Sequence, residues 1–171
     1  DLQAQIARWI GTDEPQSALL LSPPGYGKTT LLREWVRYFS DRGFTAAIAD
    51  ERSEIAALAD GVPQLAVGRC TDVMEGCSKW QSAVMLLKTM SPALLALDEI
   101  TAPEDAKAVS LCTHCGTAVI ACAHAAGLDD LRQRPIYREL LALGAFHQAV
   151  IIEKQDGQRV YRMERWEETK C

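Results

Sequence analysis

A glycine-rich stretch with a single lysine lies near the start of the chain, at residues 22–30, and reads Ser-Pro-Pro-Gly-Tyr-Gly-Lys-Thr-Thr. It follows an apolar run and precedes an amphipathic stretch, which is the context of the phosphate-binding pattern G-x-x-x-x-G-K-[ST]. Ser22 replaces the first glycine of that pattern, but the later glycines still allow tight turns close to a phosphate. We therefore predict a nucleotide-binding loop that consists of Pro24, Gly25, Tyr26, Gly27, Lys28, Thr29 and Thr30.

Two side chains of this loop are expected to contact the ligand directly. Backbone N–H groups at the start of a helix attract anions, and Lys28 can reach the β- and γ-phosphates of a nucleotide. The hydroxyl of Thr29 is a suitable Mg²⁺ ligand. A glycine-rich turn that binds nothing is the alternative, and the apolar run before the loop and the helical pattern after it disfavour that alternative. The expected cofactors are ATP and Mg²⁺.

Two adjacent carboxylates end a second apolar run, Leu-Leu-Ala-Leu, at residues 94–97. In phosphate-loop enzymes an acid at such a strand end holds the metal, which predicts that Asp98 is a Mg²⁺ ligand. The neighbouring Glu99 is then placed to deprotonate the attacking water. An ordinary strand end with solvated acids is the alternative. Together with the glycine-rich loop, this pair favours hydrolysis of ATP over binding alone.

Further polar residues follow other apolar runs and are expected at the same edge of a parallel sheet. Asp50 is followed by Glu51 and Glu54, which could add carboxylates around the metal or the water; a solvated turn is the alternative. His124 ends the run at residues 117–123 and could sense the γ-phosphate, although it could also be structural. The predicted catalytic residues are Lys28, Glu51, Glu99 and His124.

The length and the charge of the chain restrict what it can be. Its 171 residues suit a single core domain over residues 1–171, and its net charge of −5 with no basic block gives no strong nucleic-acid signal. Lysine, proline and acids interrupt the longest apolar stretch, residues 83–100, so we expect no transmembrane segment and a cytoplasmic location. Cys112 and Cys115 form a C-x-x-C without a suitably spaced second pair, which favours free thiols over zinc.

Alternation of apolar and amphipathic segments predicts an α/β domain with a mainly parallel sheet. We expect strands at residues 18–22, 45–50, 94–98 and 117–123, and helices at residues 28–41, 79–90, 103–115, 128–133 and 136–143. Residues 147–154 and 158–165 flank an Asp-Gly pair, which predicts an antiparallel hairpin closing one edge of the sheet. Residues 51–76 show little periodicity, and we expect a long functional or disordered loop there.

Several longer strings resemble the stage III sporulation protein AA family of endospore-forming bacteria, which is related to the type II and type IV secretion ATPases. The resemblance covers residues 18 to about 150 and includes S-P-P-G-Y-G-K-T-T-L-L-R-E, D-E-R-S-E-I-A, T-D-V-M-E-G-C-S-K, M-S-P-A-L-L-A-L-D-E-I and L-R-Q-R-P-I-Y. The second and third strings are more specific to the family than the glycine-rich loop. The resemblance implies a three-layer RecA-like P-loop NTPase core.

The resemblance also implies partners and roles. It implies a ring, expected to be a hexamer, that powers or organises a channel between mother cell and forespore with membrane proteins as partners. The chain would then lie peripherally at the mother-cell side of the forespore membrane, and the family's N-terminal domain would precede this core. By analogy with the secretion ATPases, Glu51 and Glu54 match an acidic box and His124 matches a histidine box.

Three positions depart from the family pattern. Cys70 stands where an arginine is expected before Thr-Asp-Val, Cys122 stands where a threonine precedes the histidine box, and Thr101 replaces a glycine after Asp-Glu-Ile. The candidates for an arginine that acts across a subunit boundary are therefore Arg69 and Arg134, with Arg132 beside the latter. Surface pairing of Arg132 and Arg134 with nearby acids is the alternative.

Three functions remain open from the sequence. The favoured one is an oligomeric motor-type ATPase of a secretion or sporulation channel. A nucleotide-binding assembly scaffold with little turnover is the second. A P-loop enzyme that phosphorylates a small substrate is the third, and it is disfavoured because Glu99 provides a water-activating base and no acceptor motif is apparent.

Overall fold

Strands and helices alternate along the chain, and the computed structural model describes residues 1–167. The strands are β1 (Ala18–Leu21), β2 (Ala46–Asp50), β3 (Leu58–Ala59), β4 (Val62–Pro63), β5 (Thr71–Glu75), β6 (Leu94–Glu99), β7 (Ala118–Ala123), β8 (Gln148–Gln155) and β9 (Gln158–Arg165). The helices are α1 (Leu2–Ile10), α2 (Lys28–Ser40), α3 (Lys79–Met90), α4 (Pro103–His114), α5 (Leu128–Arg132) and α6 (Pro135–Ala142).

Seven of the strands form one sheet in the order β5-β2-β6-β7-β1-β8-β9, and β3 pairs with β4 in a separate two-stranded sheet. Neighbours in the large sheet are parallel except β8 and β9, which are antiparallel. Asp156 and Gly157 join these two strands with φ angles of 50° and 77°, as the type I′ turn requires. The expected hairpin at one edge of a mainly parallel sheet is therefore confirmed.

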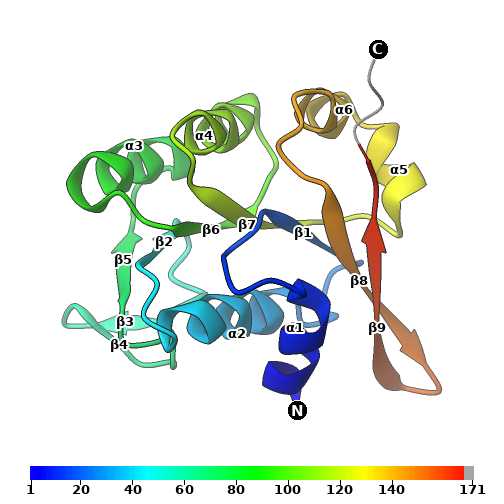
Figure 1. Cartoon of the computed structure of the whole chain (residues 1–171), viewed down its shortest axis with the longest axis horizontal. Coiled ribbons are helices and arrows are strands. Elements are labelled where there is room, and N and C mark those ends of the chain that lie inside the picture. The colour runs from blue at the N-terminus through cyan, green and yellow to red at the C-terminus, as the bar shows by residue number, and fades with distance from the viewer. Residues whose placement is uncertain (168–171) are drawn as a thin grey trace.

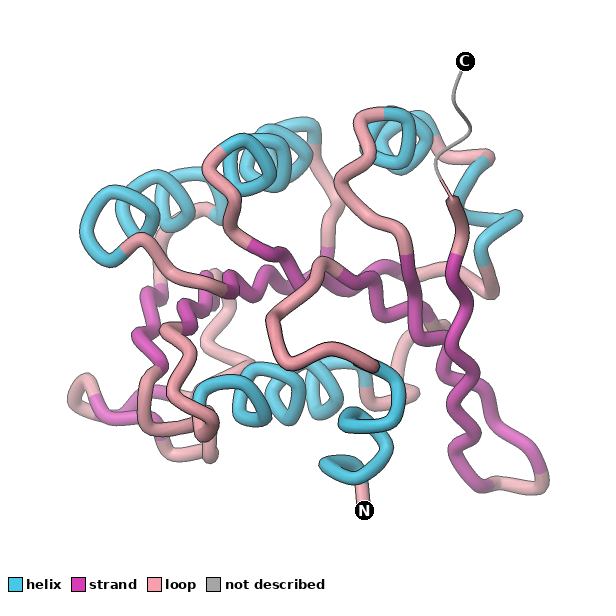
Figure 2. The backbone as a smooth tube through the Cα atoms, in the orientation of Figure 1, coloured by secondary structure: helices cyan, strands magenta, loops and turns pink. Residues whose placement is uncertain are grey.

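Helices cover the large sheet on both sides, so the fold has three layers (Figure 1). Helices α3, α4 and α6 lie over one face and α1 and α2 over the other, and Figure 2 shows the loops crossing between the layers. Side chains of a strand alternate between the two faces. Leu19 and Leu21 accordingly join the core under α3, α4 and α6, whereas Leu20 joins the core against α1 and α2.

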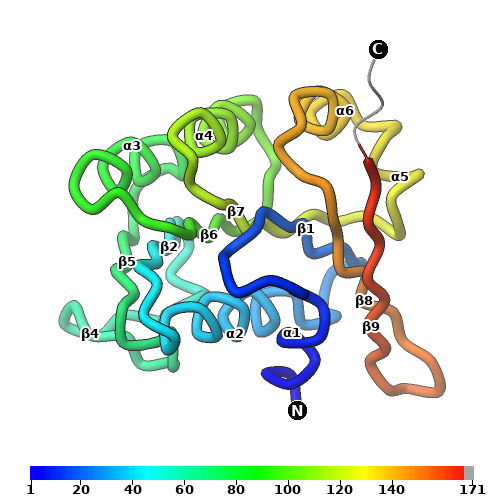
Figure 3. Tube along the Cα trace, in the orientation of Figure 1, coloured from blue at the N-terminus to red at the C-terminus, as the bar shows by residue number. Residues whose placement is uncertain are grey.

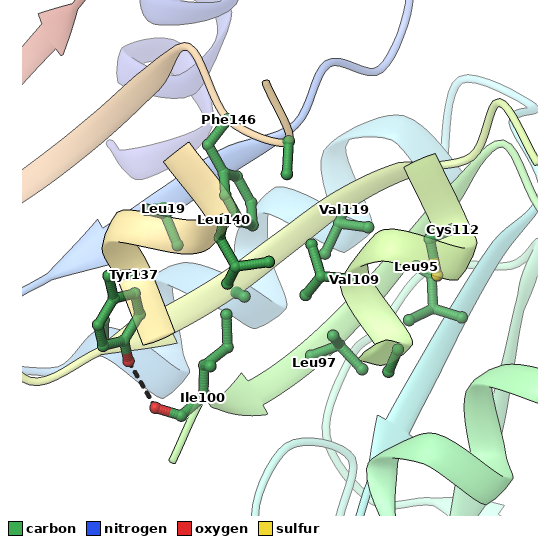
Figure 4. Close-up of a cluster of buried hydrophobic side chains, with 14 of the residues drawn as sticks. Leu19, Leu95, Leu97, Ile100, Val109, Cys112, Val119, Tyr137, Leu140 and Phe146 are labelled. Carbon is green, nitrogen blue, oxygen red and sulfur yellow. Dashed lines mark hydrogen bonds between the residues drawn. The ribbon is translucent and has the colours of Figure 1, made fainter. Parts of the chain in front are cut away.

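A buried tyrosine ties the first of these cores to the chain beyond β6. The hydroxyl of Tyr137 on α6 donates a hydrogen bond to the carbonyl oxygen of Ile100 at 2.5 Å, among the packed side chains of Leu97, Val109 and Leu140 (Figure 4). Burial raises the pKa of Tyr137 well above its ordinary value, so the hydroxyl stays a donor. This bond connects the last residue of the Leu-Arg-Gln-Arg-Pro-Ile-Tyr string to the residue that directly follows the two acids of β6.

Four elements, namely α1, β3, β4 and β5, were not expected from the sequence. Helix α1 precedes the first expected strand, although Asp1 as N-cap and Gly11 as C-cap are signals for it. Residues 51–76, expected to be a long loop, contain β3, β4 and the parallel edge strand β5. Strand β5 lacks an apolar run because it is an edge strand with exposed and half-buried residues. No helix within residues 1–167 combines the length and hydrophobicity needed to cross a membrane.

Close packing against α2 holds the start of β5 in place. Gly68 has a φ angle of 96°, and a Cβ atom there would lie 2.4 Å from both Cβ and Oγ of Ser40. The same Oγ accepts hydrogen bonds from the backbone N–H of Cys70 and the hydroxyl of Thr71, both at 2.8 Å. Gly68 is thus required for the packing of the segment that leads into Thr71 at the start of β5.

We predict that Gly68→Ala destabilises the protein more than Gly76→Ala does. Both glycines have a positive φ angle, which costs an alanine about 1–2 kcal/mol, but a Cβ atom at Gly76 meets nothing within 4 Å. Overpacking against Ser40 adds about 1–3 kcal/mol at Gly68 only. Urea unfolding of both variants measures the difference, and equal losses of stability would contradict the packing role.

Candidate functional site

The glycine-rich loop connects β1 to α2 at the carboxyl edge of the sheet. Gly25 and Gly27 have φ angles of 77° and 91°, a backbone conformation in which residues other than glycine are strained. Gly27 is also the N-cap of α2, so the first N–H groups of the helix lie at the loop. The positive end of the helix dipole therefore lies where an anion would bind.

A cavity of about 420 Å³ opens at this loop. Five segments line it: the loop itself, the turn after β2, the ends of β6 and β7, and the start of β9. The lining residues are Pro24, Gly25, Gly27, Lys28, Thr29, Arg52, Glu54, Asp98, Glu99, Cys122, His124 and Arg159. The structure thus brings most of the predicted site residues together, as expected for side chains that follow parallel strands.

Lys28 points back onto its own loop. Its Nζ donates to the carbonyl oxygen of Ser22 at 3.0 Å, to the hydroxyl of Ser22 at 3.2 Å and to the carbonyl oxygen of Pro23 at 3.2 Å. Burial lowers the pKa of Lys28, and the carboxylates of Glu99 and Asp98 oppose that shift only in part. A phosphate in the cavity would supply a stronger, charge-assisted acceptor for this ammonium.

The two acids at the end of β6 differ in their contacts. The pairing of β6 with β7 shifts register between Leu97 and Glu99, an irregularity of the kind that re-aims side chains at a strand end. Oε1 of Glu99 lies 2.8 Å from Nδ1 of His124, so the predicted base and the predicted sensor are in contact. Asp98 is buried and has no hydrogen-bond or ion-pair partner among residues 1–167, which leaves both its oxygens available to a cation.

A buried aspartate shapes the turn after β2. The Asp50 carboxylate is fully buried and accepts hydrogen bonds from the backbone N–H groups of Glu54 at 2.9 Å, Ile55 at 3.1 Å and Ala56 at 2.9 Å. Nε of Arg33 on α2 donates to the carbonyl oxygen of Ile55 at 2.6 Å. The Asp-Glu-Arg-Ser-Glu-Ile-Ala string therefore encodes one rigid turn, and that turn carries Arg52 and Glu54 into the cavity lining.

Glu51 lies outside the cavity lining. Its Oε2 accepts a hydrogen bond from Nζ of Lys79 at 2.9 Å, and the same Nζ lies 3.4 Å from Oδ2 of Asp105. Asp105 in turn accepts from the backbone N–H groups of Thr101 and Ala102, just after β6. The structure therefore does not bring Glu51 to Glu99. Lys79, the last residue of the Thr-Asp-Val-Met-Glu-Gly-Cys-Ser-Lys string, instead holds Glu51 and Asp105 together.

The remaining loop residues do not face the cavity. Tyr26 is half-buried, and its ring lies under Nζ of Lys154, which is 4.5 Å from the ring centroid. Thr30 is exposed on the first turn of α2. Neither residue is among those that line the cavity.

Neither arginine proposed to act across a subunit boundary faces the cavity of its own chain. Nη2 of Arg69 donates to the carbonyl oxygen of Asp41 at 3.2 Å, at the amino end of β5 and thus at the opposite edge of the sheet. Nη2 of Arg134 lies 3.5 Å from Oδ2 of Asp130, which is the surface pairing considered as the alternative. Arg132 pairs with Asp129 in the same way at 3.6 Å.

Two cavity arginines were not recognised from the sequence. Neither Arg52 nor Arg159 has a hydrogen-bond or ion-pair partner among the described residues, so both guanidinium groups are available to an anion. Arg52 lies within the Asp-Glu-Arg-Ser-Glu-Ile-Ala string, between Glu51 and Glu54, and this position could have indicated that it belongs to the site. Arg159 gives no local signal, because only the pairing of β9 with β8 brings it to the loop, where its Cζ would lie 2.8 Å from a Cβ atom on Gly27.

A glycine-rich loop between β1 and α2, with β7 inserted between β1 and the acid-bearing β6, defines a RecA-like P-loop fold. The ATPase DotB of Legionella pneumophila shares it with a TM-score of 0.65 and 16% identity, over 94% of this chain and 47% of DotB. The pilus retraction motor PilT, solved with bound ADP, shares it with a TM-score of 0.64 and 14% identity, over 90% of this chain and 48% of PilT. Likeness at such identities establishes the fold alone.

Residues 3–163 match the family described as sporulation stage III, protein AA, and the chain belongs to that family. Stage III sporulation protein AA of Bacillus subtilis (strain 168) is 35% identical over 154 residues, which are 87% of this chain and 48% of that protein. The chain therefore spans about half the length of this curated relative.

We predict that Asp50→Asn destabilises the turn after β2, because an amide offers one acceptor oxygen to N–H groups that now share an ionised carboxylate. Hydrogen bonds to a charged group are worth about 1.5–3 kcal/mol, and we expect a loss of that order in the free energy of unfolding. Asp60→Asn makes the same chemical change at an exposed position and serves as the control in urea unfolding. Equal stability of the two variants would contradict the role of Asp50.

Proposed function

We propose that this chain is the Mg²⁺-dependent ATPase core of a larger protein. One observation carries the proposal: the buried Asp98 and the His124-bound Glu99 line the same cavity as the glycine-rich loop and the N-terminus of α2. Donors for a triphosphate, a ligand for a cation and a base for water thus meet in one place. The ADP bound to PilT, which has the same fold, supports a nucleotide as the ligand.

The phosphates would be held by positive charge on two sides. Lys28 and the N–H groups of α2 approach from the loop, and Arg52 and Arg159 approach from the turn after β2 and from β9. Thr29 and Asp98 fit Mg²⁺, which prefers oxygen ligands and takes only one or two from the protein beside those of phosphate and water. The ion would neutralise the charge that develops on the phosphate oxygens.

Hydrolysis requires a base for the attacking water, and we assign that role to Glu99. The imidazole of His124 holds one carboxylate oxygen and leaves the other free to accept a proton. As the water oxygen bonds to the γ-phosphorus, its proton passes to Glu99 and the bond from that phosphorus to the β–γ bridging oxygen breaks. The products are ADP and inorganic phosphate.

A scaffold that binds ATP to assemble but turns over slowly is the second candidate. The observation that favours it is that Glu51 is engaged by Lys79 and that neither Arg69 nor Arg134 faces the cavity of its own chain. Arg69 and Arg134 remain candidates for insertion into the site of a neighbouring subunit. Turnover of the full-length protein at saturating Mg-ATP separates the two candidates.

For the whole protein, family membership supports a more specific proposal. The full-length protein would form a ring, proposed to be a hexamer, that powers or organises the sporulation channel between mother cell and forespore, with membrane proteins of that channel as partners. The mass of the intact protein with and without nucleotide tests the ring directly. A monomer under both conditions would contradict it.

Lys28→Ala is predicted to weaken ATP binding by about thirty- to several thousandfold. Loss of one partner from a buried charge-assisted contact costs about 2–5 kcal/mol, and every 1.4 kcal/mol is about tenfold in affinity. Isothermal titration calorimetry measures the change, with the exposed Lys107→Ala as the matched control. Unchanged affinity of Lys28→Ala would refute the assignment of the loop.

Glu99→Gln is expected to retain Mg-ATP binding and to lower turnover about 10²–10⁴-fold, because the amide keeps the shape of the side chain but cannot accept the proton. Phosphate release and calorimetry on the same preparation measure the two effects. Glu104→Gln, an exposed change in the first turn of α4, is the control. Turnover of Glu99→Gln at the unaltered rate would assign the base to another residue.

A further inference from the structure

A second cavity, of about 480 Å³, lies between α1 and β9. We call it the α1–β9 groove, and it is lined by Gln5, Arg8, Trp9, Arg159, Val160 and Tyr161. Arg159 also lines the cavity at the glycine-rich loop, so this side chain borders both cavities. A ligand that extends from the loop past Arg159 would enter the groove.

Contacts from the two ends of the chain form the walls of the groove. Nη2 of Arg165 on β9 donates to the carbonyl oxygen of Trp9 at the end of α1, and the rings of Trp9 and Tyr161 lie 5.6 Å apart between centroids. Figure 3 shows α1, at the blue end of the trace, beside the red β9. The stacking of Trp9 on Trp35 of α2, at 6.5 Å and 21°, holds the helix from the other side. The groove is therefore a preformed feature of the fold.

The chemistry of the groove suits a nucleobase. Aromatic side chains stack with bases of any kind, and Trp9 and Tyr161 provide such surfaces. Oε1 of Gln5 is buried and has no hydrogen-bond partner among residues 1–167, and an unsatisfied buried acceptor is costly. The exocyclic amino group of adenine is a donor of the required kind. Arg8 is exposed beside them and, within the described chain, has no partner of its own.

We propose that the α1–β9 groove binds the base and ribose of the nucleotide, and that Arg159 contacts the phosphate nearest the ribose. The inference rests on the proposed function, because it assumes that the triphosphate occupies the glycine-rich loop. A nucleotide joins its phosphates to its base through one sugar, and Arg159 borders both the cavity proposed for the phosphates and the groove proposed for the base. Residues from the first helix and the last strand thereby select the nucleotide.

The test compares ATP with inorganic tripolyphosphate, which has the phosphates of ATP but no base or sugar. Gln5→Leu removes the unsatisfied acceptor at nearly constant size, so it should leave the free energy of unfolding unchanged or raise it. We expect ATP affinity to fall about five- to thirtyfold and tripolyphosphate affinity to stay constant. Gln133→Leu, the same change at an exposed position between α5 and α6, is the control.

Tyr161→Leu provides a second variant with the same two probes. Loss of base stacking is worth about five- to a hundredfold in ATP affinity, again with no effect on tripolyphosphate. Arg159→Ala should weaken both probes, because its guanidinium lies at the junction of the cavities, but it should weaken ATP more. Arg138→Ala, an exposed arginine on α6, is the control for the change of charge.

The outcomes separate failure of this inference from failure of the proposed function. Equal losses of affinity for ATP and for tripolyphosphate in Gln5→Leu and Tyr161→Leu would show that these changes act on the glycine-rich loop and not on a bound base. That result would overturn the inference. Unchanged ATP affinity in both variants would overturn it too, because the base would then lie elsewhere. If the unaltered protein binds tripolyphosphate through Lys28 in either case, the proposed function stands; if it binds neither probe, both proposals fail.

Discussion

Burial of both faces of the parallel sheet governs where polar side chains can lie in this fold. Strands β1, β2, β6, β7 and β8 are lined by apolar side chains that alternate between two cores, so no polar side chain can be accommodated within them at low cost. Polar groups are therefore displaced to the strand ends. At the carboxyl edge these ends converge, and that convergence brings Asp50, Asp98, Glu99 and His124 to one edge without any local sequence relation among them.

Rigid support behind the cavity comes from side chains that do not line it. Asp50 fastens the turn after β2, and Tyr137 fastens the carbonyl group just beyond β6. Lys79 and Asp105 connect Glu51 to the first residues after the same strand. The side chains of Asp50, Tyr137, Lys79 and Asp105 are buried, and each satisfies polar atoms that would otherwise be costly. Several residues of the quoted family strings therefore support the segments that line the cavity.

Charge in the cavity is balanced between cations and acids. Lys28, Arg52 and Arg159 face Glu54, Asp98 and Glu99 around one space, and two of the three cations have no partner among residues 1–167. Burial that lowers the pKa of Lys28 also lowers the effective dielectric constant around it, which strengthens its attraction for an anion. The groove between α1 and β9 extends this site away from the acids, toward aromatic side chains that would suit the uncharged part of a nucleotide.

The local units could be predicted from the order of residues alone: a strand, a glycine-rich loop and a helix in succession, a strand ending in two acids, and a hairpin around Asp-Gly. These units depend on apolar periodicity, on glycines at positive φ and on a turn type, all of which act over a few residues. Long-range packing, in contrast, sets which distant residues meet. It placed Arg159 over Gly27, put Glu51 on Lys79 instead of in the cavity, and joined α1 to β9. Such contacts follow from the packing of elements far apart in the chain, which no local pattern records.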